Sequence, residues 1–217
     1  GEKKLRSTIA NALKVIDADL YVVLTGCTAE IVGDTVEEVV DEFREADKPV
    51  IFASTPGFKG NNYKGHEWVI DAIVDQLLEP AAAVEKGLVN LWVDVPYQDE
   101  FWLGNLRALE ELLRAIGLTP NSIFGVQRGL QNIRRIPRAE FNLLISPWVG
   151  LENVKHMQAK FGTPYLHWPT LPIGAFETSK FLRAVADYAQ LDRNKVEAFI
   201  QEREAYYYYY IERYADI

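Results

Sequence analysis

Two short apolar runs constrain the fold of this chain more than any other feature, because each is followed by a loop and then by residues with helical spacing. The runs cover residues 20–24 and 49–53. Continuous apolar runs of this length are typical of strands that are buried on both faces of a parallel sheet. Between the runs, four apolar residues share one face of a helix: Val36, Val39, Val40 and Phe43. The repeated order of strand, loop and helix predicts an α/β fold.

The chain has a boundary near residues 79–87, which include Pro80 and three consecutive alanines. After this stretch the pattern begins again. Strands are expected at residues 88–93, 122–126 and 141–145, with a short one near 164–167, and the chain is expected to end in helices over 178–188 and 193–214, the last capped by Asp192 or Asn194. We therefore expect two α/β domains, covering residues 1–84 and 85–217.

Composition and charge restrict the class of protein. The 217 residues are 48% hydrophobic and 25% charged, which is typical of a globular chain. A net charge of −8 argues against nucleic acid or an anionic membrane as the main partner. No apolar run is long enough to span a membrane. A single cysteine excludes a disulfide framework and suits a reducing cytoplasm.

That cysteine, Cys27, is expected in the loop at the carboxyl end of the first strand, where open α/β sheets bind ligands. The residues alone favour a structural role, because a lone cysteine is most often a small buried apolar residue. One thiolate is also a poor metal site by itself, since iron–sulfur and zinc sites use several ligands. The following helix can be capped either by Asp34 with Glu37 or by Thr35 with Glu38.

Other common motifs are missing from the sequence. There is no phosphate-binding Gly-x-x-x-x-Gly-Lys-[Ser/Thr] loop, so this chain should not hydrolyse ATP. There is no Gly-x-Gly-x-x-Gly, Cys-x-x-Cys or His-Glu-x-x-His. The three histidines, His66, His156 and His167, are far apart, and we interpret them as surface or hydrogen-bonded core residues.

Several elements, in order, closely resemble the nitrogenase component 1 family. The family includes the catalytic subunits, a related cofactor-assembly scaffold and the dark-operative protochlorophyllide reductase. The resemblance covers nearly all of the chain. The matching elements are Cys27-Thr-Ala-Glu-Ile-Val-Gly-Asp34, residues 52–60, Gly104-Asn-Leu-Arg107, residues 145–148 and 160–164, and Pro172-Ile-Gly174 followed by Thr178 and Phe181-Leu-Arg183.

The resemblance is to the β-type chain and implies Rossmann-like parallel sheets flanked by helices. It implies that Cys27 ligates the iron of a P-cluster, an iron–sulfur cluster at a subunit interface, together with upstream cysteines and cysteines of the partner chain. Thr35 stands where the family has a second Asp. Gly57 stands where some members have a serine that contacts the cluster. Ser146 stands where the α-type chain has a cluster-ligating cysteine, and we interpret it as a helix-capping residue. No catalytic residue is assigned.

The resemblance further implies an oxidoreductase involved in nitrogen fixation. Its partners would be an α-type component 1 subunit, within a heterotetramer, and an ATP-hydrolysing iron–sulfur reductase. The only methionine is Met157, so we interpret the chain as a piece of a longer β-like subunit that lacks a third domain. Alone, it is expected to hold no cluster and to be inactive. Two alternatives stay open: a component of a cofactor-assembly scaffold, and a cluster-free α/β binding module.

A run of five tyrosines, Tyr206 to Tyr210, falls within the last expected helix. Successive helical residues point around the whole cylinder, so these rings cannot all face one core. Tyrosine is favoured at interfaces. The run therefore indicates either an interface, to be covered by the third domain, or packing within one domain with some rings exposed.

Overall fold

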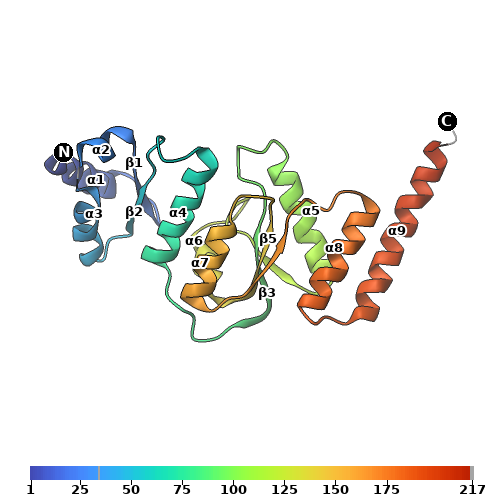
Figure 1. Ribbon diagram of the computed structural model, residues 1–217. Helices are drawn as coiled ribbons and strands as arrows, with labels where there is room; N and C mark the ends of the chain where they lie inside the picture. Colours follow the sequence, from blue (N-terminus) through green and yellow to red (C-terminus); the bar gives the residue numbers. More distant parts are fainter. Residues whose placement is uncertain (34, 216–217) are drawn as a thin grey trace. The chain divides into compact units, whose positions relative to one another are not determined.

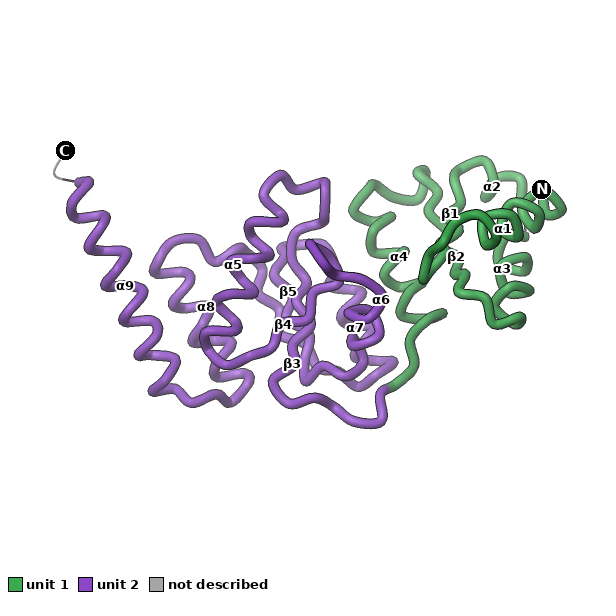
Figure 2. Tube along the Cα trace, turned by 180° about the vertical axis from the view of Figure 1, so that it is seen from behind, with its two compact units in different colours: residues 1–80 green, residues 81–217 purple. Residues whose placement is uncertain are grey.

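A computed structural model describes residues 1–33 and 35–215 of the chain. The chain divides into two compact units, Gly1–Pro80 and Ala81–Ile217 (Figure 2). Each unit contains a parallel sheet flanked by helices, which confirms the predicted α/β class.

The first unit is built on two parallel strands, β1 (Tyr21–Thr25) and β2 (Val50–Ser54), which pair from Tyr21 with Val50 to Thr25 with Ser54. Helices α1 (Glu2–Val15) and α3 (Val36–Glu45) share one core with the sheet. Helix α4 (Asn62–Leu77) packs against β2, and the short α2 (Cys27–Val32) follows β1. The core shared by α1, α3 and the strands is formed by Ile9, Val36, Val39, Val40 and Val50.

The second unit has four parallel strands in the order β4-β3-β5-β6 (Figure 1). Their bounds are β3 Glu85–Trp92, β4 Thr119–Asn121, β5 Ala139–Ile145 and β6 Tyr165–Trp168. The helices are α5 (Trp102–Ala115), α6 (Leu130–Arg134), a 3-10 turn η1 (Ile136–Arg138), α7 (Leu151–Phe161), α8 (Gly174–Tyr188) and α9 (Arg193–Ala215). Helices α5 and α8 cover one face of the sheet and α6 and α7 the other (Figure 1).

The main core lies between the sheet and helices α5, α8 and α9. Alternate residues of the central strands point into it, as expected for a pleated strand. Its fully buried members include Val89, Phe141, Leu143, Leu113 and Phe181. This core explains why the strands read as apolar runs in the sequence.

The opposite face of the same strands carries a row of asparagines in register, Asn121, Asn90 and Asn142, on β4, β3 and β5. All three are buried. The Asn121 amide donates to Asn90 at 2.9 Å, and the Asn90 amide donates to Asn142 at 3.0 Å. The Asn142 oxygen also accepts from the Trp92 indole at 2.9 Å. Because a slip by one residue would turn every side chain to the other face, this row fixes the register of the three strands.

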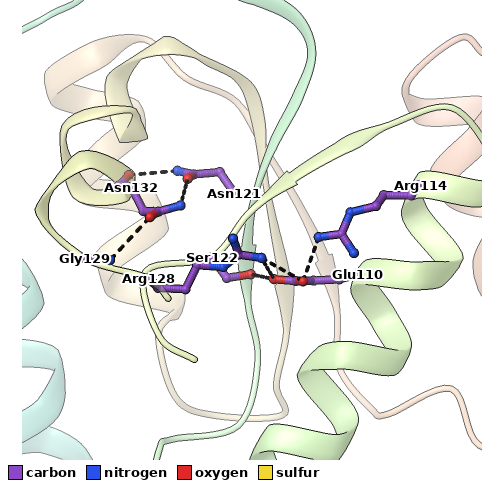
Figure 3. Close-up of polar contacts among 7 residues, drawn as sticks. All are labelled: Glu110, Arg114, Asn121, Ser122, Arg128, Gly129 and Asn132. Atoms are coloured by element: carbon purple, nitrogen blue, oxygen red, sulfur yellow. Dashed lines mark hydrogen bonds and ion pairs between the residues drawn. The ribbon is translucent and has the colours of Figure 1, made fainter. Parts of the chain in front are cut away.

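Next to β4, a buried glutamate on α5 collects three donors (Figure 3). Glu110 accepts from the Ser122 hydroxyl at 2.7 Å, from Arg114 at 2.8 Å and from Arg128 at 2.9 Å. Burial acts to raise the pKa of Glu110, but these hydrogen bonds outweigh it, and the net pKa is below the ordinary value. The cluster anchors the segment that follows β4 to α5.

The lowered pKa predicts an acid-sensitive contribution to stability. A carboxyl group whose folded pKa is depressed stabilises the fold above its unfolded pKa, about 4.3, and this contribution is lost as the pH falls through the folded pKa. We expect Glu110→Gln to lose less unfolding free energy than the native chain between pH 7 and pH 3. Urea unfolding across this range measures the effect. The exposed neighbour supplies the control, since Glu111→Gln should keep the native slope; equal slopes for all three proteins would contradict the assignment.

The predicted strand at residues 122–126 is wrong, because the strand is β4 and ends at Asn121. The Ser122 side chain is instead engaged by Glu110, and the backbone then turns, with positive φ at Gly125 and at Gln127. Helix α4 begins at Asn62, where the Asn61 side chain caps it by accepting from the Lys64 amide.

Caps were predicted with mixed success. Asp192 accepts from the Asn194 amide at 3.0 Å and from the Lys195 amide, as expected for a residue that caps α9. The pairing of Thr35 with Glu38 is wrong, because the Thr35 hydroxyl donates to Glu2 at 2.6 Å and makes no cap bond. The alternative at Asp34 lies outside the described residues. Among the described helices, none is both long and apolar enough to cross a membrane.

Candidate functional site

Cys27 lies where β1 ends, but it is the first residue of the short helix α2 rather than part of a loop. Gly26 separates it from the strand and serves as the N-cap residue. The Cys27 side chain is exposed. The structure therefore does not support the buried core role that the residues alone favoured.

The loop after β2 lies against the sulfur. A Cβ atom added to Gly57 would lie 3.5 Å from Cys27 Sγ, and among the described residues outside its chain neighbours no other atom would be within 4 Å. Gly57 does not have a positive φ, and an added Cβ would meet the sulfur at an ordinary van der Waals distance. Because β1 and β2 are parallel, both segments follow the same edge of the sheet, and that edge presents an open thiol.

Glu30 ties these two segments together from within α2. Its carboxylate accepts from the Thr25 hydroxyl at 3.0 Å and from the Ser54 hydroxyl, and Thr25 and Ser54 are register partners at the ends of β1 and β2. It also forms an ion pair with Lys59 at 3.3 Å. The Ser54 and Thr25 hydrogen bonds lower the pKa of Glu30, with a smaller contribution from Lys59.

A second set of hydrogen bonds joins the same strand ends. The Thr55 hydroxyl donates to the Thr25 carbonyl oxygen at 2.8 Å, and the Thr55 amide donates to the Thr25 hydroxyl at 3.4 Å. The start of the Gly57 loop is thus fixed to the residue that precedes Gly26. Sequence analysis did not single out Glu30, Thr25 or Ser54, because their pairing depends on strand register.

The described residues do not provide enough side chains in one place to bind a metal without ligands from elsewhere. Within residues 1–33 and 35–215, no three histidine, cysteine or acidic side chains gather as a metal-binding group. An exposed thiol beside a glycine fits the donation of one thiolate to a cluster, and the other ligands must come from outside the described residues. Cys27 is the residue for which the resemblance implies this role.

Ser146 follows β5 in the second unit and has a structural role. Its hydroxyl accepts from the Val149 amide at 3.0 Å, and its carbonyl oxygen accepts from His167 Nε2 at 2.7 Å. Helix α7 starts only at Leu151, after Gly150, so Ser146 caps the turn before the helix rather than the helix itself. His167 is a hydrogen-bonded histidine, as predicted.

The carboxyl edge of the four-stranded sheet is rich in exposed apolar side chains that sequence analysis missed. The connection after each strand, including the first turn of α8, contributes at least one: Tyr97, Phe101, Val126, Trp148, Ile173 and Phe176. Asp94 lies half-buried among them, where burial raises its pKa although the Asn105 amide donates to it at 2.6 Å. No alternation marks these residues in the sequence, since they lie in irregular connections. Trp148 and Ile173 fall within elements that match the family, but nothing in those elements indicated that their side chains are exposed.

The five tyrosines lie on the second half of α9, and each is 41% to 57% exposed. Tyr206, Tyr207 and Tyr210 line one wall of a groove of about 770 Å³ between α9 and helices α5 and α8. The opposite wall carries small residues, among them Ala108 and Ala175. The groove is a feature of the second unit alone.

Comparison with known proteins places this fold and site in a family. The profile of the family described as "Nitrogenase component 1 type Oxidoreductase" matches residues 1–215, so the chain belongs to that family of oxidoreductases. The resemblance predicted from the sequence is confirmed.

Relatives of this chain include the B subunits of light-independent protochlorophyllide reductases. The chain is 26% identical over 219 residues to the one from Angiopteris evecta, covering 97% of this chain and 41% of that protein. It is 28% identical over 179 residues to the one from Adiantum capillus-veneris, covering 77% of this chain and 33% of that protein. The chain thus spans well under half the length of these relatives.

The fold is also that of solved structures. A structure titled "Nitrogenase Cp1 at pH 6.5" superposes with a TM-score of 0.76 over 94% of this chain and 39% of that chain, at 21% sequence identity. A second, titled "Nitrogenase Cp1 at pH 5", gives a TM-score of 0.75. These likenesses confirm the Rossmann-like architecture predicted for a component 1 protein.

Proposed function

We propose that this chain is part of a β-type subunit of a nitrogenase-like component 1 complex, in which Cys27 supplies one thiolate to an interfacial iron–sulfur cluster of the P-cluster type. The observation that carries the proposal is the exposed Cys27 sulfur at the carboxyl edge of a parallel sheet, facing the gap at Gly57. Membership of the family supports it.

In this proposal the bound cluster supplies one-electron transfer chemistry, and the chain supplies the surroundings of one ligand. Cys27 binds as the thiolate, the form in which cysteine ligates metals. Gly57 lies beside the sulfur without placing a side chain against it. No residue of this chain is assigned to bond making or proton transfer. The remaining ligands are cysteines upstream in the same subunit and cysteines of an α-type partner subunit, which also carries a cofactor. A second partner is an ATP-hydrolysing iron–sulfur reductase, and the complex assembles as a heterotetramer in the cytoplasm.

An iron and acid-labile sulfide assay tests the ligand count. We expect the purified chain alone to bind no stoichiometric cluster after anaerobic reconstitution, because one thiolate cannot replace the several that iron–sulfur clusters use. The same assay on the chain co-purified with an α-type subunit, as part of the full-length β-type protein, should show cluster iron. A stoichiometric cluster in the isolated chain would overturn the shared-ligand proposal.

Three functions are candidates for the complex: reduction of dinitrogen, reduction of protochlorophyllide, and assembly of a cofactor. Nitrogen reduction follows from the family resemblance, whereas the names of the relatives favour reduction of protochlorophyllide. Assays of the reconstituted complex for ammonia from dinitrogen and for the absorbance change of protochlorophyllide reduction separate them. A complex that carries cluster iron but reduces neither substrate would favour the third candidate, a cofactor-assembly scaffold.

We also propose that residues 1–84 belong to a first domain, residues 85–217 to a middle domain, and that a third domain outside this chain covers the tyrosine side of α9. The groove beside Tyr206, Tyr207 and Tyr210 supports this, because exposed apolar grooves mark interaction surfaces. We expect the tyrosines to become protected from surface labelling in the full-length protein relative to this chain. Equal labelling in both would contradict the proposal.

A further inference from the structure

Glu30, which is close to Cys27 in the chain, makes contacts that the proposed role of Cys27 does not explain. Glu30 lies three residues after Cys27, on the same short helix. Its carboxylate contacts three separate segments: the end of β1 through Thr25, the end of β2 through Ser54, and the following loop through Lys59. This partly exposed carboxylate is therefore engaged by contacts that cross between elements rather than by solvent alone.

We propose that Glu30 is a positioning residue that holds Cys27 and the Gly57 loop in one fixed arrangement, so that the sulfur is presented to its cluster from a rigid edge. The ligand role of Cys27 rests on the function proposed above. The arrangement of the two segments does not, since it is a property of this chain.

Helix α2 depends on the contacts of Glu30 for its orientation. Helix α2 has six residues, none of them buried, and it ends at Gly33 with a left-handed backbone. Isolated helices of this length are unstable in water. Apolar packing does not hold α2 in place, so the polar contacts of Glu30 at the strand ends must supply much of its orientation.

The ion pair of Glu30 with Lys59 and its hydrogen bonds with Thr25 and Ser54 contribute unequally to the position of α2. The Lys59 ammonium is about half exposed, and an exposed ion pair of this kind contributes little. The Thr25 and Ser54 hydroxyls are charge-assisted donors at the part-buried end of the sheet, where hydrogen bonds are stronger. We therefore expect the hydroxyl contacts, not the ion pair, to position α2.

Disulfide trapping tests the arrangement without any cluster. Cys27 is the only cysteine, so Gly57→Cys creates a single possible intramolecular disulfide. The position of a Cβ at residue 57, 3.5 Å from Cys27 Sγ, is close to what a disulfide needs. We expect Gly57→Cys to cross-link rapidly in a glutathione redox buffer, and Glu30→Ala in that background to slow cross-linking about tenfold, because a mobile segment lowers the effective concentration of the thiol.

Two variants distinguish positioning from general damage. Glu30→Gln keeps an oxygen that accepts from Thr25 and Ser54, so it should restore cross-linking to within about twofold of the parent, because the acceptor is retained. Lys59→Ala should also stay within about twofold, because the exposed ion pair contributes little. The thermal midpoint of every variant is measured alongside. A cross-linking rate in Glu30→Ala equal to that of the parent, or a slowing that Gln does not reverse, would overturn the proposal.

A second readout separates this inference from the ligand role. In the full-length complex with glycine at residue 57, Glu30→Ala should leave cluster iron present but alter the cluster's electron paramagnetic resonance spectrum, while Glu30→Gln should retain the native spectrum. If no cluster iron depends on Cys27, the proposed function fails, yet the cross-linking result still decides whether Glu30 positions the two segments.

Discussion

Cys27→Ala is expected to remove most of the P-cluster-type iron from the assembled component 1 complex while leaving the chain folded. The thiol is exposed, and surface substitutions away from special features usually change the free energy of unfolding by less than about 0.5 kcal/mol. In the proposed function Cys27 ligates a shared cluster, and residues 1–33 and 35–215 hold no group of three or more histidine, cysteine or acidic side chains that could take over from its thiolate. Electron transfer to the partner subunit should fall with the iron content.

Iron and sulfide per complex, with the thermal midpoint of the chain, measure this effect. Cys27→Ser should recover little, because a hydroxyl is a hard and weakly acidic ligand compared with a thiolate. The adjacent Thr28→Ala is a matched control, since Thr28 is exposed on the same turn and should leave iron unchanged. Native iron and native activity in Cys27→Ala would instead favour a cluster-free α/β binding module.

The second large effect is expected in the core of the second unit. Phe181, on α8, is fully buried and packs edge-on against Trp168 with the ring centroids 5.6 Å apart. Truncation of a buried phenylalanine loses its transfer free energy and leaves a cavity, so Phe181→Ala should lower the free energy of unfolding by about 3–5 kcal/mol. Few single substitutions are expected to destabilise this chain more.

The same helix provides a control. Phe176 is 74% exposed, and Phe176→Ala should cost less than about 0.5 kcal/mol in the isolated chain. The free energy of unfolding of both variants is measured by urea unfolding, with amide hydrogen exchange in β5 and α8 as the probe. This probe reports on the second unit by itself. Similar destabilisation by the two substitutions would show that Phe176 is also packed, contrary to the structure.

Most of the fold was predictable from local pattern. The apolar runs at β2, β3 and β5 identified buried parallel strands, because a strand covered on both faces has no polar alternation. The run at β1 is also a parallel strand, but its predicted burial on both faces is wrong, because Val22 and Leu24 are exposed. Helix α3 was marked by apolar spacing, and helices α8 and α9 were expected at residues 178–188 and 193–214, with Asp192 as a cap for α9. The resemblance of ordered motifs to component 1 proteins added the family, which the comparison confirms.

Where local pattern failed, long-range contacts decided the outcome. Residues 122–126 have the apolar character of a strand, but Ser122 is captured by Glu110, twelve positions earlier, and the backbone turns away. The row of Asn90, Asn121 and Asn142 carries no strand signal at all, yet register brings the three amides together across β4, β3 and β5. Polar residues in such positions are stable only because their partners lie on neighbouring strands.

The same division holds at the candidate site. The sequence by itself determined that the only thiol follows an apolar strand, at the edge of a parallel sheet where ligands bind. It did not determine whether that thiol is buried or exposed, that Gly57 lies beside it, or that Glu30 binds both strand ends. Those facts depend on the pairing of Thr25 with Ser54, residues 29 positions apart in the chain, and only the tertiary structure brings such residues into contact.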